Sequence, residues 1–387
     1  MKNAFLNEQE VRKKLSQFIL QCDRFSMGKL CHQFELEFAN YQGSKHAVLF
    51  NSGSSANLAI LQTYLNLGKL KKGDQVGFSA LTWSTNAMPI IQLGMEPVPI
   101  DCDPSTLNCM STNLRNSLKD FNLKAFFATN VLGFCGDLKN IQNLCDEKNI
   151  LFIEDNCESL GTITNGKKTG SFGEAASFSF YVAHHMSTIE GGMVCTQDEE
   201  VDTMLRMVRA HGWDRNLPEK TRRTLHMKHK LESKFKANYT FYDLGYNLRP
   251  TEITGFLGLN QLQYLEKSNS YRHKTYKLLS ETMQNNEDLR PPDYKHIDFL
   301  SCFATPVISR TNKLRDYYIN RFQEAKIEIR PIIAGNIQNQ PFFRKYIGSS
   351  HQLLGADHLD QNGFYCGLYP DITEEELQVI QSCLDRG

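Results

Sequence analysis

Three absences in the sequence each exclude a class of protein. No apolar run approaches the roughly 18 residues that span a membrane, and residues 1–18 mix charged with apolar side chains, unlike a signal peptide. Lys plus Arg and Asp plus Glu both number 43, so the chain has no net field that would favour nucleic acid or an anionic membrane. The 11 cysteines are odd in number and include no CxxC pair, a pattern typical of reduced thiols. We therefore expect a cytoplasmic protein with no nucleic-acid partner and no membrane partner.

The length of 387 residues, 41% of them hydrophobic, predicts two or three domains. Short apolar runs alternate with helical patterns such as Ser55–Leu65 and Leu138–Glu147 in the first half of the chain. This alternation predicts an α/β fold with a largely parallel sheet covered by helices on both faces. The expected strands are Ala47–Phe50, Gln75–Ser79, Glu96–Ile100, Leu123–Thr129, Ile150–Glu154, Ala176–Tyr181 and Gly192–Thr196.

A change of pattern near residue 250 predicts the boundary between a large domain, 1–249, and a smaller domain, 250–387. Residues 245–279 are typical of one long helix that begins near Pro250, where proline suits a first helical turn. The preceding segment, 215–240, is basic and favours either a solvated, mobile loop or a flap over an anionic ligand. Its charged residues are Arg215, Lys220, Arg222, Arg223, Lys228, Lys230, Lys234 and Lys236, against Glu219 and Glu232.

Three polar segments follow expected strands, at the edge where parallel sheets bind ligands. Asn51–Ser55 joins a strand to a helix, and its glycine and hydroxyls suit either a phosphate or a plain helix cap. Asp155 follows a buried strand, where a carboxylate can be a helix cap, a metal ligand or the partner of a protonated ring nitrogen. For His184 and His185, three roles are open: a structural role, binding of zinc as a pair, or action as a base. We expect no metal, because adjacent residues on a strand point to opposite faces.

Five motifs carry a resemblance to a known family. In order, NSGSSAN, LTWSTNA, EDNCESLG, SFSFYVAHHMSTIEGG and GYNLRPTE resemble the aspartate-aminotransferase-type fold (fold type I) and, more narrowly, nucleotide-sugar aminotransferases that use pyridoxal phosphate (PLP). The resemblance covers essentially the whole chain and implies a mostly parallel central sheet with a smaller C-terminal α+β domain. In this family a lysine in the fourth motif binds the cofactor covalently, whereas His184 stands at that position here. No lysine occurs between Thr169 and Glu219, so a shifted alignment restores none.

A histidine in place of that lysine marks the sugar 3-dehydratase branch of the family. One group in this branch couples an iron–sulfur cluster to the cofactor through four cysteines. Cys157 matches the first of them, but the other three fall near Arg215, Leu217 and Leu225, so we expect no iron–sulfur cluster. Segments similar to the group that needs no cluster are FSMG (25–28), RAHGWDRNLPEK (209–220) and IEIRPIIAGN (327–336).

The resemblance implies a role for each residue that matches a family motif. Asp155 would keep the ring nitrogen of the cofactor protonated, and Trp83 would stack on the ring. Glu158 would lie near the ring hydroxyl, with a purely structural role as its alternative. The residues expected to bind the cofactor phosphate are Gly53, Ser54 and Ser179, joined by Asn247 from the second subunit of a homodimer.

The implied reaction removes the C3 hydroxyl of a nucleotide 4-keto-6-deoxy sugar. Pyridoxamine phosphate (PMP) supplies an amine to the C4 ketone, His184 moves a proton so that the C3 hydroxyl departs, and L-glutamate restores the amine while ammonia is released. GDP is the expected nucleotide, with CDP and dTDP left open. Side chains expected to hold the diphosphate, or else only to solvate the surface, are His211, Arg215 and Arg330. An aminotransferase and a non-catalytic cofactor-binding homologue are the alternatives.

Overall fold

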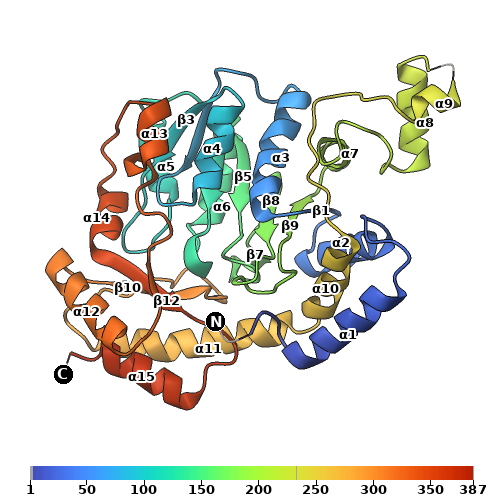
Figure 1. Cartoon of the computed structure of the whole chain (residues 1–387). Helices are drawn as coiled ribbons and strands as arrows, with labels where there is room; N and C mark the ends of the chain where they lie inside the picture. The colour runs from blue at the N-terminus through green and yellow to red at the C-terminus, as the bar shows by residue number, and fades with distance from the viewer. Residues whose placement is uncertain (1–2, 232, 387) are drawn as a thin grey trace.

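The computed structural model describes residues 3–231 and 233–386 and is built on a seven-stranded sheet (Figure 1). The strand order is β1-β9-β8-β5-β4-β2-β3. β9 runs antiparallel to both of its neighbours, and the remaining pairs are parallel. The predicted α/β fold with a mostly parallel sheet is therefore confirmed. The strands are β1 His46–Phe50, β2 Gln75–Ser79, β3 Glu96–Ile100, β4 Leu123–Thr129, β5 Leu151–Asp155, β8 Ala175–Ser179 and β9 Gly192–Thr196.

Five α-helices in the described residues (α3, α7, α10, α12 and α15, with bounds below) begin at a capping side chain. Oxygens of Ser52, Asp198, Thr251, Thr311 and Thr373 accept first-turn N–H groups that have no partner within the helix. The helices are α1 Glu8–Gln21, α2 Lys29–Gln42, α3 Gly53–Asn66, α4 Ser84–Gln92, α5 Ser111–Ser117, α6 Leu138–Lys148, α7 Glu199–Val208, α8 Glu219–Lys228, α9 Lys234–Ala237, α10 Glu252–Leu262, α11 Leu265–Gln284, α12 Asn312–Glu324, α13 Pro341–Tyr346, α14 Leu354–Asn362 and α15 Glu374–Leu384, with short 3-10 turns η1 Val131–Gly133 and η2 Ile337–Asn339.

Both faces of the central sheet are apolar, because successive residues of a strand point to opposite sides. In β1, Val48 and Phe50 pack in one cluster with residues of α3, α4 and α7. Ala47 and Leu49 pack on the other face with residues of α2. The sheet is thus covered on both sides, as the alternating pattern predicted.

Predicted strand bounds agree with the structure except at β1, β5 and β8. β1 begins one residue earlier than predicted, at His46, and β5 ends one residue later, so Asp155 is its last residue. β8 ends at Ser179 instead of Tyr181, because the chain turns there: the N–H of His184 donates to the Tyr181 carbonyl at 2.8 Å. The two histidines therefore lie in a turn, so the expectation that they point to opposite faces of a strand was wrong.

The prediction of one long helix over 245–279 was also wrong. α10 ends at Leu262 and α11 begins at Leu265, with a tight turn between them in which the Tyr264 N–H donates to the Gln261 carbonyl at 3.0 Å. The two helices pack against different clusters, α10 against α1 and α11 against the C-terminal helices, so the axis changes direction. Pro250 precedes the Thr251 cap and so lies just outside the first turn.

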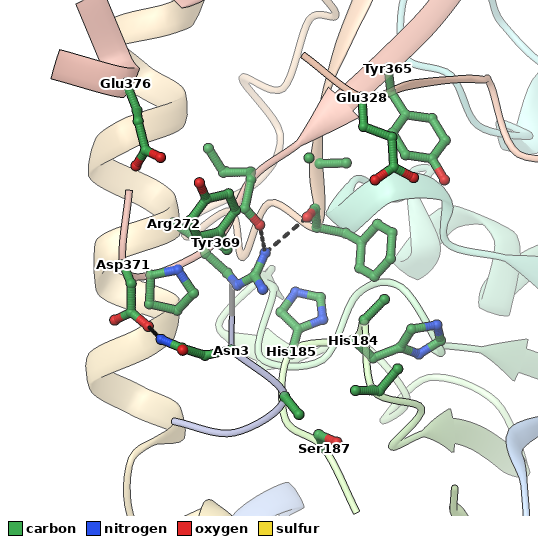
Figure 2. A pocket seen from close by; sticks show the side chains of 18 of the residues that line it. Asn3, His184, His185, Ser187, Arg272, Glu328, Tyr365, Tyr369, Asp371 and Glu376 are labelled. Carbon is green, nitrogen blue, oxygen red and sulfur yellow. Dashed lines mark hydrogen bonds between the residues drawn. The ribbon is translucent and has the colours of Figure 1, made fainter. Parts of the chain in front are cut away.

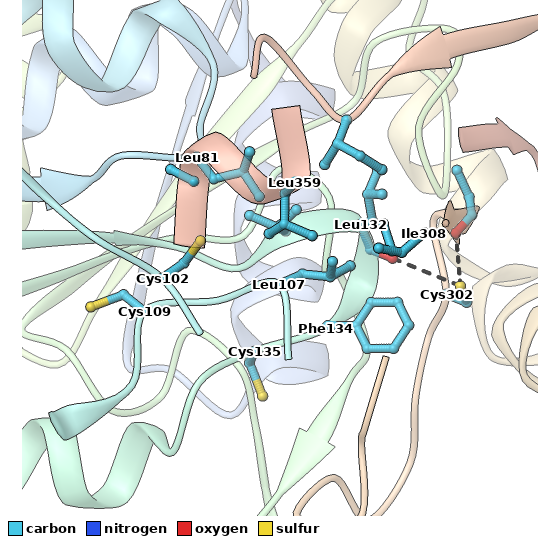
Figure 3. Packing of buried hydrophobic residues seen from close by; sticks show 14 of the residues in the cluster. Leu81, Cys102, Leu107, Cys109, Leu132, Phe134, Cys135, Cys302, Ile308 and Leu359 are labelled. Atoms are coloured by element: carbon cyan, nitrogen blue, oxygen red, sulfur yellow. Dashed lines mark hydrogen bonds between the residues drawn. The ribbon is translucent and has the colours of Figure 1, made fainter. Parts of the chain in front are cut away.

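A second, three-stranded antiparallel sheet lies in the C-terminal part of the chain, in the order β10-β12-β11. Its buried side chains join the large cluster beneath the central sheet: Figure 3 shows Leu81 and Leu107 together with Ile308 and Leu359. The division at residue 249 stays a prediction. The strands outside the central sheet are β6 Ile163–Thr164, β7 Lys167–Lys168, β10 Ala304–Ile308, β11 Ile329–Pro331 and β12 Gly363–Gly367.

Side chains satisfy the open edge of β1, which leads into the Asn51–Ser55 segment. The Leu49 N–H donates to Glu35 at 2.9 Å, and Arg209 donates to the Leu49 carbonyl at 2.7 Å and to Glu35 at 2.6 Å. Arg206 donates to the second oxygen of Glu35 at 2.8 Å. Burial raises the pKa of Glu35, but the two arginines outweigh it and hold that pKa well below its usual range. This buried network fixes β1 against α2 and α7.

The basic segment 215–240 is partly helical, contrary to the loop expectation: it carries α8 and α9 and projects from the body of the molecule (Figure 1). The stretches of chain that enter and leave this segment are paired by isolated antiparallel β-bridges, one between Trp213 and Phe241 and one between Ala210 and Asn247. Glu232 lies outside the described residues. Across the residues that the structure describes, no helix is both long enough and apolar enough to cross a bilayer.

Candidate active site

The Asp155 carboxylate lies buried at the carboxyl edge of the sheet and accepts three N–H groups. Asn57 of α3 and Asn86 of α4 donate to Oδ2 at 2.9 and 2.8 Å, and the Cys157 main chain donates to Oδ1 at 2.9 Å. The side chain is only 4% exposed. These donors hold the carboxylate in one orientation without neutralising its charge.

The N-terminus of α3 lies against the end of β8. A Cβ atom on Gly53 would lie 2.7 Å from the Ser179 Cβ and 3.0 Å from the Cys157 Sγ, so only glycine permits this approach. The Ser52 hydroxyl accepts the Ser55 N–H at 3.1 Å, whereas Ser54 is exposed in the first turn. The structure therefore brings the predicted phosphate residues of α3 and β8 together at a helix N-terminus, where an anion is stabilised.

Trp83 precedes α4, the helix that carries Asn86, and its side chain is 55% exposed. A large apolar side chain left open at this edge is available to cover a flat ring. Its placement on the Asp155-bearing edge agrees with the predicted stacking role, which stays a prediction.

His184 lies half-buried in the turn after β8 and lines a cavity of about 650 Å³ (Figure 2). Its ring meets two aromatic rings nearly at right angles: Tyr181 at 5.9 Å and 85°, and Phe303 at 5.2 Å and 88°. His185 is 2% exposed, and its Nε2 lies 3.0 Å from the Ser301 carbonyl oxygen. His184 is therefore the histidine that faces the cavity, and His185 is a structural neighbour.

The imidazole of His184 is neutral at neutral pH. Burial lowers its pKa to about 4, Arg272 contributes to the lowering, and Asp155 and nearby main-chain groups oppose it. A neutral imidazole can accept a proton, which is the state that a general base requires.

Glu158 lies just beyond Asp155 and accepts the Leu132 N–H at 2.9 Å. Burial raises its pKa to about 7, and the Asp155 charge also raises it, while the Leu132 N–H lowers it. Near neutral pH this carboxyl group therefore exists in both protonation states, so it can donate as well as accept a hydrogen bond.

The three predicted diphosphate residues do not lie together. Arg330 lines the same cavity as His184, and its guanidinium pairs with Glu328 at 2.6 Å. Arg215 begins the projecting segment, and its guanidinium stacks 5.2 Å from the Trp213 ring. His211 lies just before that segment, where its N–H donates to the Tyr246 carbonyl at 2.8 Å. Neither Arg215 nor His211 is among the described residues that line the His184 cavity.

Asn247 is exposed, and its Oδ1 accepts a hydrogen bond from Arg249 at 2.9 Å. The neighbouring Leu248 carbonyl accepts the Asn51 N–H at 3.0 Å. The segment that carries Asn247 thus lies beside the Asn51–Ser55 turn, with its side chain open to a second molecule.

Sequence reasoning missed the residues that hold Asp155 and those that pack on His184. Asn57 and Asn86 stand inside two of the motifs that carry the resemblance, NSGSSAN and LTWSTNA, and an amide in such a motif was the available signal. Nothing in the sequence marked Phe303, which lies 119 residues beyond His184. That contact arises only from the tertiary fold.

A family model described as the DegT/DnrJ/EryC1/StrS aminotransferase family matches residues 7–385. The chain belongs to this family. GDP-4-keto-6-deoxy-D-mannose 3-dehydratase of Escherichia coli O55:H7 is 32% identical over 379 residues, which cover 97% of each chain. The family and branch predicted from the motifs are confirmed.

Two crystal structures of a GDP-4-keto-6-deoxymannose-3-dehydratase share the fold with a TM-score of 0.88, at 31% identity and 97% coverage of both chains. One is a histidine-to-asparagine variant with bound GDP-perosamine. The other contains a trapped PLP-glutamate geminal diamine.

The residues of the site fit the cofactor of this PLP-dependent family. Asp155 is a buried carboxylate with no ion pair to a basic side chain in the described ranges, so a protonated ring nitrogen would complete it. Gly53 leaves room for a phosphate at the start of α3, and Trp83 is open at the start of α4. The Asp155 carboxylate thus matches the ring nitrogen of PLP, the space at Gly53 matches its phosphate, and the exposed Trp83 side chain matches its flat ring.

Replacing Gly53 by alanine tests the expected phosphate site between the N-terminus of α3 and Ser179. The added Cβ would displace Ser179 from the helix N-terminus, so Gly53→Ala is expected to retain cofactor at least tenfold more weakly, a loss of about 1.4 kcal/mol or more. Cofactor retained after gel filtration, read by absorbance, measures this. Gly367→Ala is the matched control, because a Cβ there meets no atom within 4 Å. Equal retention in both variants would contradict the assignment.

Proposed function

We propose that this chain is a PMP-dependent 3-dehydratase that converts GDP-4-keto-6-deoxy-D-mannose to the 4-keto-3,6-dideoxy sugar. The observation that carries the proposal is His184 at the position of the family's lysine, beside a retained Asp155 site. The similarity to dehydratases over 97% of the chain supports the same assignment.

The chain's own residues would hold the cofactor at the edge of the sheet. When bound, the cofactor supplies an amine for the C4 ketone and a ring that withdraws electrons. Asp155 keeps the ring nitrogen protonated, and Trp83 covers the ring. Gly53, Ser54 and Ser179 bind the phosphate. Glu158, with its pKa raised to about 7, donates to or accepts from the ring hydroxyl.

His184 would act as the proton carrier of the reaction. Histidine cannot bond covalently to the aldehyde form of the cofactor as lysine does, so the amine form persists as a dissociable reagent. Neutral His184 accepts a proton at the cavity edge and returns it to the departing C3 hydroxyl. Its low pKa keeps it in the accepting state before substrate binds.

L-Glutamate would supply the two electrons that reduce the sugar when the C3 oxygen is lost. The net reaction is sugar plus glutamate to 3-deoxy sugar, 2-oxoglutarate and ammonia, which balances without a one-electron donor. This agrees with Arg215, Leu217 and Leu225 at the positions where cluster-dependent enzymes carry cysteine.

We propose a homodimer in which Asn247 binds the cofactor phosphate of the partner subunit. The exposed side chain of Asn247 beside the Asn51–Ser55 turn supports this arrangement. In such a dimer Arg215 of the projecting segment and His211 just before it bind the diphosphate, and Arg330 binds it from the cavity. A cytoplasmic location, with all 11 cysteines as free thiols, completes the proposal.

A substrate panel tests the function. The purified protein, loaded with PMP, is given GDP-, CDP- and dTDP-linked 4-keto-6-deoxy sugars with L-glutamate. We expect ammonia and 2-oxoglutarate in equal amounts with loss of the C3 hydroxyl, fastest with GDP-4-keto-6-deoxymannose. A stoichiometric 4-amino sugar would make the protein an aminotransferase. No absorbance change when glutamate is added to the PLP-loaded protein would make it a passive binder.

Arg215→Ala tests the diphosphate assignment. Loss of a charged hydrogen bond of about 1.5–3 kcal/mol should raise the sugar KM about tenfold or more. The glutamate half-reaction involves no nucleotide and should be unchanged. Arg223→Ala, which removes an exposed arginine of the same segment, is the control. Equal damage to both half-reactions would instead assign Arg215 to the cofactor or the fold.

A further inference from the structure

Phe303 packs its ring against both histidines of the turn after β8. It meets His184 at 5.2 Å and 88°, and His185 at 5.8 Å and 47°. Tyr181 meets the His184 ring from another direction at 5.9 Å and 85°. Edge-to-face contacts of this kind depend on ring orientation, so two of them define the plane of the His184 imidazole.

One ring nitrogen of His184 is not oriented by a hydrogen bond. In the described part of the chain, Nδ1 of His184 is buried and has no hydrogen-bond partner. A histidine that moves protons is ordinarily oriented by a hydrogen bond at one ring nitrogen. At Nδ1, aromatic packing stands in the place of that bond, while hydrogen-bonding main-chain groups at Ser179 and Cys157 also face the imidazole.

Phe303 is itself held by buried polar contacts. Arg272 of α11 donates to the carbonyls of Phe303, Cys302 and Leu368 at 2.8, 3.3 and 2.5 Å, and dashed lines in Figure 2 mark bonds made by its guanidinium. The Phe303 N–H donates to the Leu132 carbonyl at 3.0 Å. Arg272 is only 4% exposed. The backbone that presents the ring is thus fixed from α11 and from the turn after β4.

We propose that Phe303 is a positioning residue for the reaction: its ring fixes the orientation of the His184 imidazole and keeps water from one side of it. The inference rests on the proposed function, in which His184 moves the proton. Phe303 touches no reacting atom in this assignment and acts only through His184.

The charged and polar groups that act on His184 do not include the Phe303 side chain. The groups that influence its ionisation are the Asp155 carboxylate from β5, the Arg272 guanidinium from α11, His185 from the same turn, and the main chain at Ser179 and Cys157. Exchange of Phe303 for another apolar residue leaves each of these groups in the protein. A change in the titration of His184 then reports the loss of the ring.

The test compares Phe303→Leu with Phe299→Leu. Phe299 is also half-buried and packs on a histidine, His273, with ring centroids 4.8 Å apart, but outside the cavity. Imidazole titrations are followed by NMR on the full chain with and without PMP, and the His184 signal is identified by its absence in His184→Asn. Phe303→Tyr keeps the ring. Phe303→Met, which fills a similar volume without a ring, replaces the leucine variant if that variant does not fold.

We expect Phe303→Leu to raise the pKa of His184 by about one unit or more, toward the reference value near 6.5, because water then reaches the imidazole. The acid limb of the rate profile should move upward with it, and kcat should fall about tenfold with the sugar KM within about twofold. Phe303→Tyr and Phe299→Leu should titrate as the unaltered protein does.

An unchanged His184 titration in Phe303→Leu, or the same loss of kcat in Phe299→Leu, would overturn the proposal. Failure of the proposed function has a different signature: full dehydration by His184→Asn. That result would leave the effect of Phe303 on the His184 titration unchanged, and it would show that the reaction does not need His184 to move the proton.

Discussion

The buried carboxylate of Asp155 is the charge on which the rest of the site depends. A carboxylate that is 4% exposed is costly unless it is hydrogen bonded, and Asn57, Asn86 and the Cys157 N–H meet that need. The two amides come from α3 and α4, so three strand–helix units must be in register before the carboxylate is satisfied. Gly53 begins α3 and Trp83 precedes α4, so the same two helices carry both residues. In the proposed function, cofactor affinity and folding are therefore linked at one residue.

The second constraint is the turn that ends β8 at Ser179. It takes His184 out of the sheet and into a cavity, where rings from the turn itself and from the C-terminal part of the chain meet its imidazole. The dehydratase chemistry then follows from what histidine can and cannot do. It can exchange a proton near neutral pH, and it cannot hold the cofactor as a covalent adduct.

The strands that are set by a local apolar pattern could be predicted from the sequence. The ends of elements that are set by tertiary contacts could not. The apolar runs of β2, β3, β4 and β9 gave the observed bounds. The end of β8 and the break before Leu265 did not follow from apolar pattern, because a turn and two packing partners set them. Gly53 and Asp155 were found through motifs. Phe303 could not be found, because no local pattern marks a side chain that reaches the site from the far half of the chain.

The central claim is that the cofactor is held at this edge without a covalent bond, beside a histidine. It is tested most directly by treating the PLP-loaded protein with borohydride and measuring the mass of the denatured chain. The account predicts an unmodified chain and free reduced cofactor, because no lysine occurs between Thr169 and Glu219. A pyridoxyl group on a lysine would contradict it, since another residue would then occupy the position assigned to His184.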